Sequence, residues 1–221
     1  MSGSTDAVVI VPLKSFESAK SRLGGHLDAA QRSDLVRSMA ATVLRAAHPL
    51  ATIVVCDDPA VASFAAAEGA HVVTTAPEGL NAALDAALRY ATGVGVQRVT
   101  VVPADLPFAT DLDRFVGADD ELVIVADRHG DGTNLLSFPA GCDLRFAFGQ
   151  GSFRAHLDEA ARLGLTARIV DDAAIAWDVD EPADLSPPPE LGTLATLGAA
   201  VPFPDDERVF STQTTAPTTG P

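Results

Sequence analysis

The sequence predicts an α/β fold in which a mixed, mostly parallel sheet carries helices on both faces. Short apolar runs rich in β-branched residues recur along the chain, and segments of helical length separate several of them. Continuous apolar runs are typical of strands buried on both faces, and strand–helix alternation with short links is typical of parallel βαβ units. The chain has 221 residues, enough for one such domain with a substantial core.

The expected strands are short apolar runs, each ended by a charge, a proline or a turn. They cover residues 7–11, 52–56, 70–74, 98–102, 122–126, 135–138 and 166–170. The expected helices have apolar residues at helical spacing or follow turn residues that suit a helix start. They cover residues 28–47, 60–68, 77–90 and 154–163, with a last helical turn from Pro182.

The composition narrows the function classes. The formal net charge of -15 argues against nucleic acid or an anionic membrane as partner, because both need a basic face. No apolar run approaches the roughly 18–20 residues of a membrane span, and no signal peptide is visible. Cys56 and Cys142 lack CxxC spacing, so we expect free core thiols in a reducing cytoplasm.

The composition changes at Ser186. Residues 186–221 hold seven of the fifteen prolines and seven threonines, with one basic residue, Arg208. We therefore expect one domain over residues 7–185, followed by a tail that is disordered or loosely docked and takes no part in the site.

Positive charge is concentrated in the loop after the first expected strand. Lys14 and Lys20 are the only lysines of the chain, and Arg22 lies two residues further on. Open α/β sheets bind ligands at the carboxyl ends of their strands, and a lysine ammonium binds phosphate as a compact charge. The loop has neither a GxGxxG nor a Walker A pattern. We expect a phosphate site here, and the alternative is two lysines left by chance in an arginine-rich composition.

Asp105 lies between Pro103 and Pro107, directly after the strand expected at 98–102. Because the prolines end that strand, the carboxylate arrives at the ligand-binding edge of the sheet. It is either a Mg²⁺ ligand of the kind that shares the metal with phosphates, or a cap of a helix near Thr110.

Two glycine-containing helix starts are further candidates. Gly79 and Asn81 bring N–H groups and an amide to the sheet edge, which suits an anion or a base edge, or they are a plain helix start. Gly149, Gly151 and Ser152 precede the helix at 154–163, where they bind a phosphate or carboxylate, or form a turn and a cap.

The remaining candidates are polar residues near strand or helix ends. Thr133 heads a strand at the edge, and His156 either faces the same anion as Ser152 or packs. In an extended segment Asp178 and Asp180 point to one face, where they share a cation with Asp105 or are solvated acids. The adjacent acids at 57 and 58 are expected to be turn and cap residues.

Six segments follow one another in a specific order within residues 7–185. They are Pro12, Lys14, Ala19-Lys20 and Arg22-Leu23; Gly79-Leu80-Asn81; Ala104-Asp105-Leu106-Pro107; Gly132-Thr133-Asn134; Phe148 to Phe153 with His156; and Asp178 to Pro182. In that order they closely resemble the guanylyltransferases of deazaflavin coenzyme F-420 biosynthesis, which act on 2-phospho-L-lactate or phosphoenolpyruvate. The sequence departs from that family at Glu181, where a threonine is usual.

The resemblance implies a glycosyltransferase-A-like nucleotidyltransferase with GTP, a three-carbon phospho-acid acceptor and Mg²⁺. It implies that the phosphates of GTP and the catalysis depend on Lys14, Lys20, Arg22 and Asp105. It places the rest of GTP near Pro12, Leu13, Gly79, Leu80, Asn81, Pro103 and Ala104. It places the acceptor near Thr133, Gly149, Gly151 and Ser152, and the metal on Asp105 with Asp178 or Asp180.

The implied reaction agrees with the residue types. The acceptor phosphate attacks the α-phosphate of GTP in line, and it is already ionised near neutral pH, so no general base is required. Catalysis is then positioning and charge neutralisation.

The acceptor and the exact class stay open at this point. Phosphoenolpyruvate is favoured, because an alanine-rich, lysine-poor composition is associated with the actinobacterial phosphoenolpyruvate enzymes of this family, and 2-phospho-L-lactate and 3-phosphoglycerate are the other candidates. Transfer of another nucleotide to a sugar or polyol phosphate, and a non-catalytic nucleotide-binding regulator, are the alternatives. The oligomeric state is also open.

Overall fold

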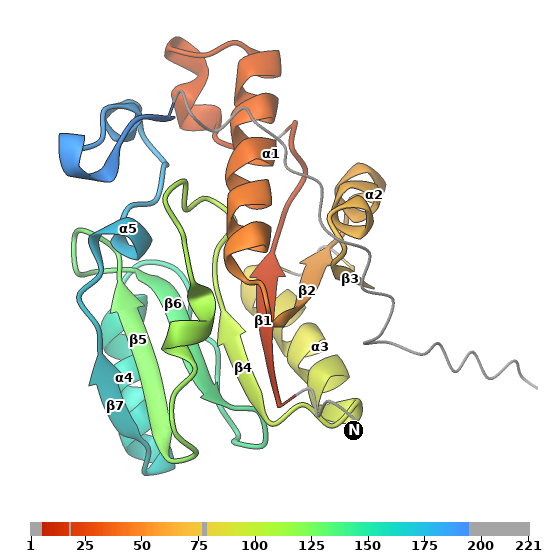
Figure 1. Ribbon diagram of the computed structural model, residues 1–221, viewed down its shortest axis with the longest axis vertical. Coiled ribbons are helices and arrows are strands. Elements are labelled where there is room, and N and C mark those ends of the chain that lie inside the picture. Colours follow the sequence, from red (N-terminus) through yellow and green to blue (C-terminus); the bar gives the residue numbers. More distant parts are fainter. Residues whose placement is uncertain (1–5, 18, 77–78, 195–221) are drawn as a thin grey trace, which may run out of the picture.

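The computed structural model describes residues 6–17, 19–76 and 79–194 of the chain. Within these ranges one sheet has the strand order β3-β2-β1-β4-β6-β5-β7 (Figure 1). Its strands are β1 (Ala7–Pro12), β2 (Ala51–Cys56), β3 (His71–Thr74), β4 (Arg98–Val101), β5 (Glu121–Ala126), β6 (Thr133–Pro139) and β7 (Thr166–Ile169). β6 runs antiparallel to β4 and β5, and the other adjacent pairs are parallel. The mixed, mostly parallel sheet is therefore confirmed.

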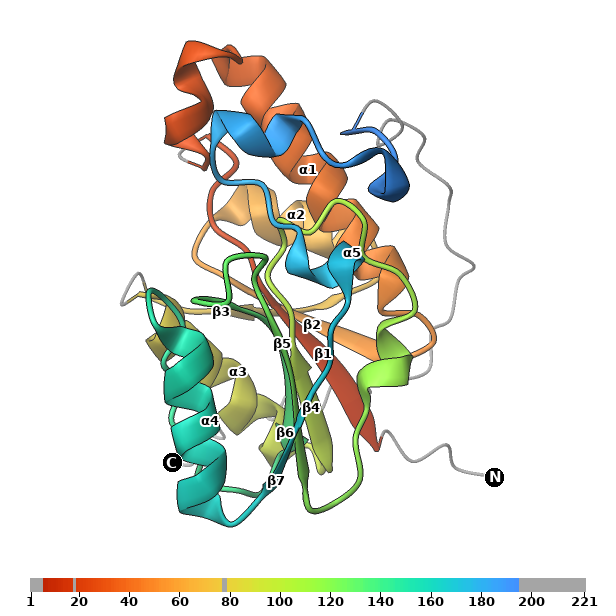
Figure 2. The same ribbon diagram turned by 90° about the vertical axis from the view of Figure 1, so that its left-hand side faces the viewer.

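Helices cover both faces of this sheet, as the sequence predicts (Figure 2). They are α1 (Ala29–Ala46), α2 (Pro59–Ala67), α3 (Leu80–Gly93), α4 (Ser152–Leu163) and α5 (Ala173–Ala176). One apolar cluster joins α1, α2 and α5 to the sheet, and a second joins α3 and α4 to the opposite face. Along β1, Val9 and Val11 belong to the first cluster while Val8 and Ile10 belong to the second, because successive strand residues point to opposite faces.

The ends of several elements differ from the expected ones. α4 begins at Ser152 rather than two residues later, because Gly151 is its N-cap. α3 continues to Gly93. The described ranges also contain four short 3₁₀ helices, η1 (Ser21–Gly25), η2 (Leu112–Phe115), η3 (Pro182–Leu185) and η4 (Pro189–Leu191). η3 is the predicted last turn, whereas η1, η2 and α5 are too short to show a helical period in sequence.

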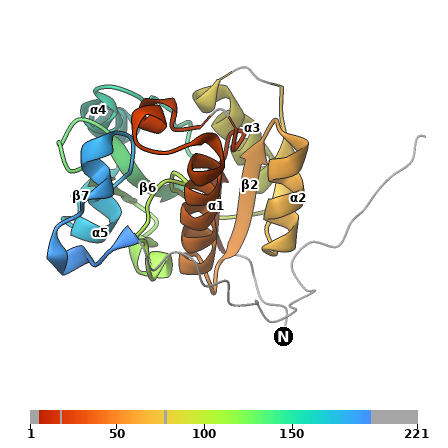
Figure 3. The same cartoon turned by 90° about the horizontal axis from the view of Figure 1, so that it is seen from above.

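One edge of the sheet gathers the candidate residues. β1, β2, β3 and β4 run parallel, so their carboxyl ends lie together, and antiparallel pairing brings the amino end of β6 to the same edge. Figure 3 looks down on this edge, with α1 and α2 on one side and α3 and α4 on the other. The topology therefore joins loops from distant parts of the chain.

The remaining predictions concern the tail, the membrane and the cysteines. Leu194 packs against the cluster beneath α1, so the described start of the tail is docked, and residues 195–221 lie outside the described residues. In the described ranges no helix is long and apolar enough to cross a membrane. Cys56 is a buried free thiol, and Cys142 is free but only half-buried.

Candidate active site

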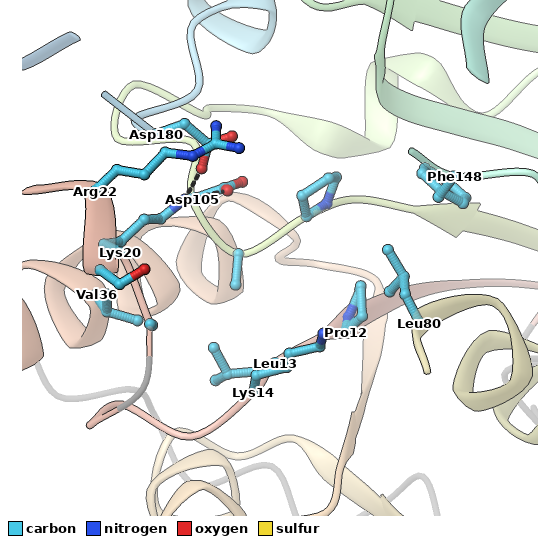
Figure 4. Close-up of a pocket in the computed structure, with 14 residues that line it drawn as sticks. Pro12, Leu13, Lys14, Lys20, Arg22, Val36, Leu80, Asp105, Phe148 and Asp180 are labelled. Carbon is cyan, nitrogen blue, oxygen red and sulfur yellow. Dashed lines mark hydrogen bonds and ion pairs between the residues drawn. The ribbon is translucent and has the colours of Figure 1, made fainter. Parts of the chain in front are cut away.

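A pocket of about 430 Å³ opens at the carboxyl ends of β1 and β4 (Figure 4). Ten of the expected residues line it, namely Pro12, Leu13, Lys14, Lys20, Arg22, Leu80, Pro103, Ala104, Asp105 and Asp180. Four further residues line it and were not predicted as site residues, because a serine and three apolar side chains carry no chemical signal in the sequence; they are Ala19, Ser21, Val36 and Phe148. The lysine loop and the acids thus share one cavity.

The Lys20 ammonium lies between two carboxylates at one end of this pocket. Its Nζ is 2.6 Å from Asp105 Oδ2 and 2.7 Å from Asp180 Oδ1. Burial opposes the charge, but the two acids outweigh it and raise the pKa of Lys20 above its ordinary value. The Lys20 backbone is left-handed, with φ 56° and ψ 39°. Such strain in a non-glycine residue is typical of functional sites.

Asp105 is not a helix cap. It lies in a turn after β4, and the next helix, η2, begins at Leu112. Its Oδ2 accepts from Lys20, and its buried Oδ1 has no hydrogen-bond partner among the described residues. The cap alternative is therefore wrong, and one carboxylate oxygen remains available to a ligand.

The segment with the acid pair is fixed beside the end of β4. The Val179 N–H donates to the Asp105 carbonyl at 3.2 Å, and Val179 is buried in the apolar cluster against which Trp177 packs. Asp180 is exposed toward the pocket and reaches Lys20. Asp178 is half-buried and accepts from Asn134 Nδ2 at 3.3 Å, so the solvated-acid alternative is wrong for Asp178. Burial, with the charge of Asp105, raises the pKa of Asp178.

Two residues that hold this segment were missed by sequence reasoning. The Asp184 carboxylate is 1% exposed and accepts the N–H groups of Asp180 and Glu181, each at 2.7 Å. It also pairs with Arg128, which donates to the Asp178 carbonyl at 3.2 Å. Nothing in the local sequence marks Arg128 or Asp184, because their partners come from other parts of the chain.

His156 is a packed residue that holds Thr133. Thr133 Oγ1 is 3.0 Å from His156 Nδ1, and the Ala147 N–H donates to His156 Nε2 at 3.1 Å. Nε2 is thus the acceptor, so Nδ1 carries the proton and donates to Thr133. Burial lowers the pKa of His156 to about 4, so the ring is neutral and is no cationic anion ligand.

The glycine–serine turn before α4 differs from a free anion cradle. Gly149 and Gly151 adopt φ values of +131° and +72°, which favour glycine. The N–H groups of Gly151 and Phe153 donate to Asp131, and that of Ser152 donates to Gly149. The expectation of free N–H groups is therefore wrong for Gly151 and Ser152. The Ser152 hydroxyl is buried and has no partner among the described residues.

Asn81 also has partners within the protein. Its Oδ1 accepts from the Phe148 N–H at 2.9 Å, and its Nδ2 donates to the Phe148 carbonyl at 3.3 Å. The amide ties the start of α3 to the loop before α4 and is not free for a base edge. Thr133, Gly149, Gly151 and Ser152 do not line the 430 Å³ pocket.

Residues 7–187 match the family model described as "Guanylyl transferase CofC like". The chain belongs to this guanylyltransferase family. A phosphoenolpyruvate guanylyltransferase of Rubrobacter xylanophilus is 39% identical over 80% of this chain and 90% of the relative. A 2-phospho-L-lactate guanylyltransferase of Methanocaldococcus fervens is 30% identical over 80% of this chain and 82% of the relative. A cytidylyltransferase of Leptospira borgpetersenii shares the fold, with a TM-score of 0.53 and 11% identity over 81% of this chain and 83% of that chain.

This guanylyltransferase is thus a nucleotidyltransferase enzyme, and the predicted family and fold are confirmed. The predicted assignment of individual residues to GTP, acceptor and metal stays a prediction.

The pocket of the guanylyltransferase fits Mg²⁺ on two carboxylates. Asp105 and Asp180 already converge on one cation, the Lys20 ammonium, and Asp105 Oδ1 is buried without a partner among the described residues. Mg²⁺ commonly takes one or two carboxylates and completes its shell with phosphates and water. In the part of the chain that the structure describes, no three His, Cys, Asp or Glu side chains are arranged to hold a metal. The expected set with Asp178 as third ligand is therefore not preformed.

A second pocket of about 210 Å³ adjoins the first in this guanylyltransferase. The two share Pro12, Leu13, Lys14 and Leu80. The second extends beneath the ends of β2 and β3 and includes Gly79, one of the residues expected near GTP. Together the pockets offer a charged end at Lys20 and a less charged end at β2 and β3.

Proposed function

We propose that the chain transfers GMP from GTP to phosphoenolpyruvate and releases pyrophosphate, as a step of coenzyme F-420 biosynthesis. Membership of the guanylyltransferase family carries the proposal. The higher identity to the phosphoenolpyruvate enzyme than to the 2-phospho-L-lactate enzyme, 39% against 30%, supports the choice of acceptor.

The triphosphate of GTP lies along the loop after β1 in this proposal. Lys14, Lys20 and Arg22 line the pocket from that loop and supply three positive charges in a chain of net charge -15. Such local charge overcomes the repulsion that the whole acidic protein exerts on an anion. Pro12, Leu13, Pro103 and Ala104 form the backbone wall against which the nucleotide rests.

Asp105 and Asp180 are the proposed Mg²⁺ ligands, and the ion, when bound, neutralises phosphate charge. The Lys20 ammonium and Mg²⁺ cannot both lie between Asp105 and Asp180. When the metal ion binds, the Lys20 ammonium therefore leaves these two carboxylates and binds phosphate oxygens of GTP instead. Asp178 stays with Asn134 and supports the segment from beneath.

The chain's contribution to the reaction is positioning. The acceptor phosphate is its own nucleophile, so the side chains only have to align it with the α-phosphate and stabilise the charge of the departing pyrophosphate. Lys14, Lys20 and Arg22 are suited to the second task, because ammonium and guanidinium groups form strong charge-assisted hydrogen bonds with phosphate oxygens.

Thr133 and Ser152, beside the turn of Gly149 and Gly151, are the proposed acceptor residues. They act through their hydroxyls, because the N–H groups of Gly151 and Ser152 are bonded within the protein. His156 donates its Nδ1 proton to Thr133 Oγ1, which leaves the hydroxyl proton of Thr133 free to be donated to a carboxylate or phosphate oxygen. The buried hydroxyl of Ser152, which has no partner among the described residues, lies one turn before His156 on α4 and offers a second donor.

The test is pyrophosphate release with GTP and Mg²⁺ and each of three acids: phosphoenolpyruvate, 2-phospho-L-lactate and 3-phosphoglycerate. We expect the highest kcat/KM with phosphoenolpyruvate. A higher kcat/KM with either of the other acids would identify that acid as the acceptor. No pyrophosphate release with any of the three would refute the proposed function.

A further inference from the structure

We propose that Asp57 selects guanine, by accepting hydrogen bonds from N1–H and the 2-amino group of the base. The inference rests on the proposed use of GTP and adds the residue that chooses the base.

Asp57 is placed by the end of β2. It directly follows Cys56, the last residue of a strand that lies between β1 and β3, and it lines the 210 Å³ pocket. That pocket meets the phosphate pocket along Pro12, Leu13 and Lys14. A nucleotide with its phosphates near Lys20 therefore has a continuous path for its base into the space beside Asp57.

The neighbouring acid, Asp58, has a different task. Its carboxylate accepts from the N–H groups of Ala60 and Val61 at 2.8 and 3.1 Å and caps α2. Asp57 is exposed and makes no hydrogen bond or ion pair with another described residue. The expectation that both acids are turn and cap residues is thus right for Asp58, while the carboxylate of Asp57 is free to accept from a ligand.

Asp57 is the negatively charged hydrogen-bond acceptor among the described side chains of this pocket. Lys14 is the other charged side chain among the described lining residues, and it lies on the side shared with the phosphate pocket. Burial raises the pKa of Cys56, which keeps the thiol neutral. Thr75, after β3, adds a hydroxyl.

A carboxylate at this place matches guanine among the common bases. Guanine presents two adjacent donors, N1–H and the 2-amino group, and a carboxylate presents two acceptors in the same spacing. The corresponding edges of adenine and cytosine include an unprotonated ring nitrogen, and uracil has one N–H between two carbonyls. Each of these sets a lone pair against the carboxylate, which is an unfavourable contact.

The experiment is the variant Asp57→Asn, with kcat/KM measured for GTP, inosine triphosphate and xanthosine triphosphate. Inosine lacks the 2-amino group, and xanthosine carries a carbonyl in its place. We expect the wild type to prefer GTP over both. Asp57→Asn should lose about 10–100-fold with GTP, the loss expected for charge-assisted hydrogen bonds. It should gain with xanthosine triphosphate, because the Asn amide can donate to that carbonyl.

The gain with xanthosine triphosphate is the decisive result, because a folding defect cannot increase activity with a different base. Asp120→Asn is the matched control, since Asp120 is exposed before β5 at the opposite end of the sheet, and it should behave as the wild type. An unchanged order of the three nucleotides in Asp57→Asn would overturn the inference.

Calorimetric binding of the same three nucleotides separates this inference from the proposed function. If the wild type binds GTP but releases no pyrophosphate with any acid, the proposed function fails. In that case a shift of binding preference from GTP to xanthosine triphosphate in Asp57→Asn still supports the role of Asp57, and an unshifted preference refutes it.

Discussion

Lys20 is the residue on which the charges of the site converge. Asp105 and Asp180 share its ammonium, and the lysine is held there in a left-handed backbone conformation. Without a cation at this point the two carboxylates would repel each other. The position between the two carboxylates therefore suits either the Lys20 ammonium or a metal ion. Replacing Lys20 is therefore a direct test of metal binding at this position.

Replacing Lys20 with Met tests this exchange. We expect loss of pyrophosphate release, a Tm lowered by a few degrees, and a larger increase of Tm with Mg²⁺ than the wild type shows, because the ion takes the vacated position. Thermal unfolding with and without Mg²⁺, in the absence of nucleotide, measures it. Lys14→Met is the control, since Lys14 is exposed and makes no ion pair with a described residue. Equal Mg²⁺ responses in all three proteins would contradict the exchange.

His156 makes stability depend on pH. Its folded pKa of about 4 lies below its ordinary 6.5, so the unfolded state binds more protons in this window and the folded state loses stability as the pH falls through it. The shift of this pKa corresponds to about 3 kcal/mol of folding free energy. Below about pH 4 this residue adds no further loss.

The variant His156→Asn lacks this dependence. The difference in free energy of unfolding between wild type and His156→Asn should therefore shrink by about 3 kcal/mol between pH 6.5 and pH 4, measured by urea denaturation. His129→Asn, at an exposed turn, is the matched histidine-to-asparagine control. Parallel curves for wild type and His156→Asn would show that the buried ring is not neutral.

At the scale of elements, the segment that carries Asp178 and Asp180 has no regular secondary structure and depends on neighbours for its shape. Asp184 binds two of its N–H groups, and Arg128, after β5, binds Asp184 and the Asp178 carbonyl. The Arg128 guanidinium also lies 4.6 Å from the centre of the Trp177 ring. Neither Arg128 nor Asp184 is among the described lining residues of the 430 Å³ pocket, so this network holds Asp180 from outside the pocket.

A double-mutant cycle on Arg128→Met and Asp184→Asn tests the network. Either single change breaks a buried ion pair and should lower the free energy of unfolding by about 3–5 kcal/mol. Either change should also lower kcat, because Asp180 is then held less firmly. The double variant should cost less than the sum by about 0.5–3 kcal/mol, since no lone buried charge remains. Additive costs in chemical denaturation would mean that the two residues act independently.

At the scale of the whole molecule, the packed domain extends beyond the end of the family match. The family match ends at residue 187, but Leu194 still packs against the cluster beneath α1. The tail predicted from residue 186 therefore begins inside the packed structure, and the cut that spares the domain lies after Leu194.

Two truncations test that boundary. A chain ending at Leu194 should keep the Tm and the pyrophosphate release of the full chain. A chain ending at Leu185 should lose stability, because the apolar contact of Leu194 is removed. The reverse outcome, loss of activity on removal of residues 195–221, would place that segment in the function.

Much of the site was predictable because its charged residues directly follow strands in the sequence. The two lysines follow one strand and Asp105 follows another, so the rule that parallel strands end together places them at one edge. The network of Arg128 and Asp184 was not predictable, because those residues are 56 positions apart and either alone looks like an ordinary surface charge. The adjacent acids Asp57 and Asp58 have the same local signal, and only the path of the chain separates their roles.

The sequence by itself determined the fold class, the family and the phosphate-binding loop, because apolar runs, segment order and clustered charge are properties of the chain. The tertiary structure alone decided which partners those groups meet. It placed Asp180 on Lys20, tied Asp178 to Asn134 and turned His156 into a neutral support for Thr133. The physical reason is that a side chain's charge state and free lone pairs depend on burial and on neighbours that folding brings from distant segments.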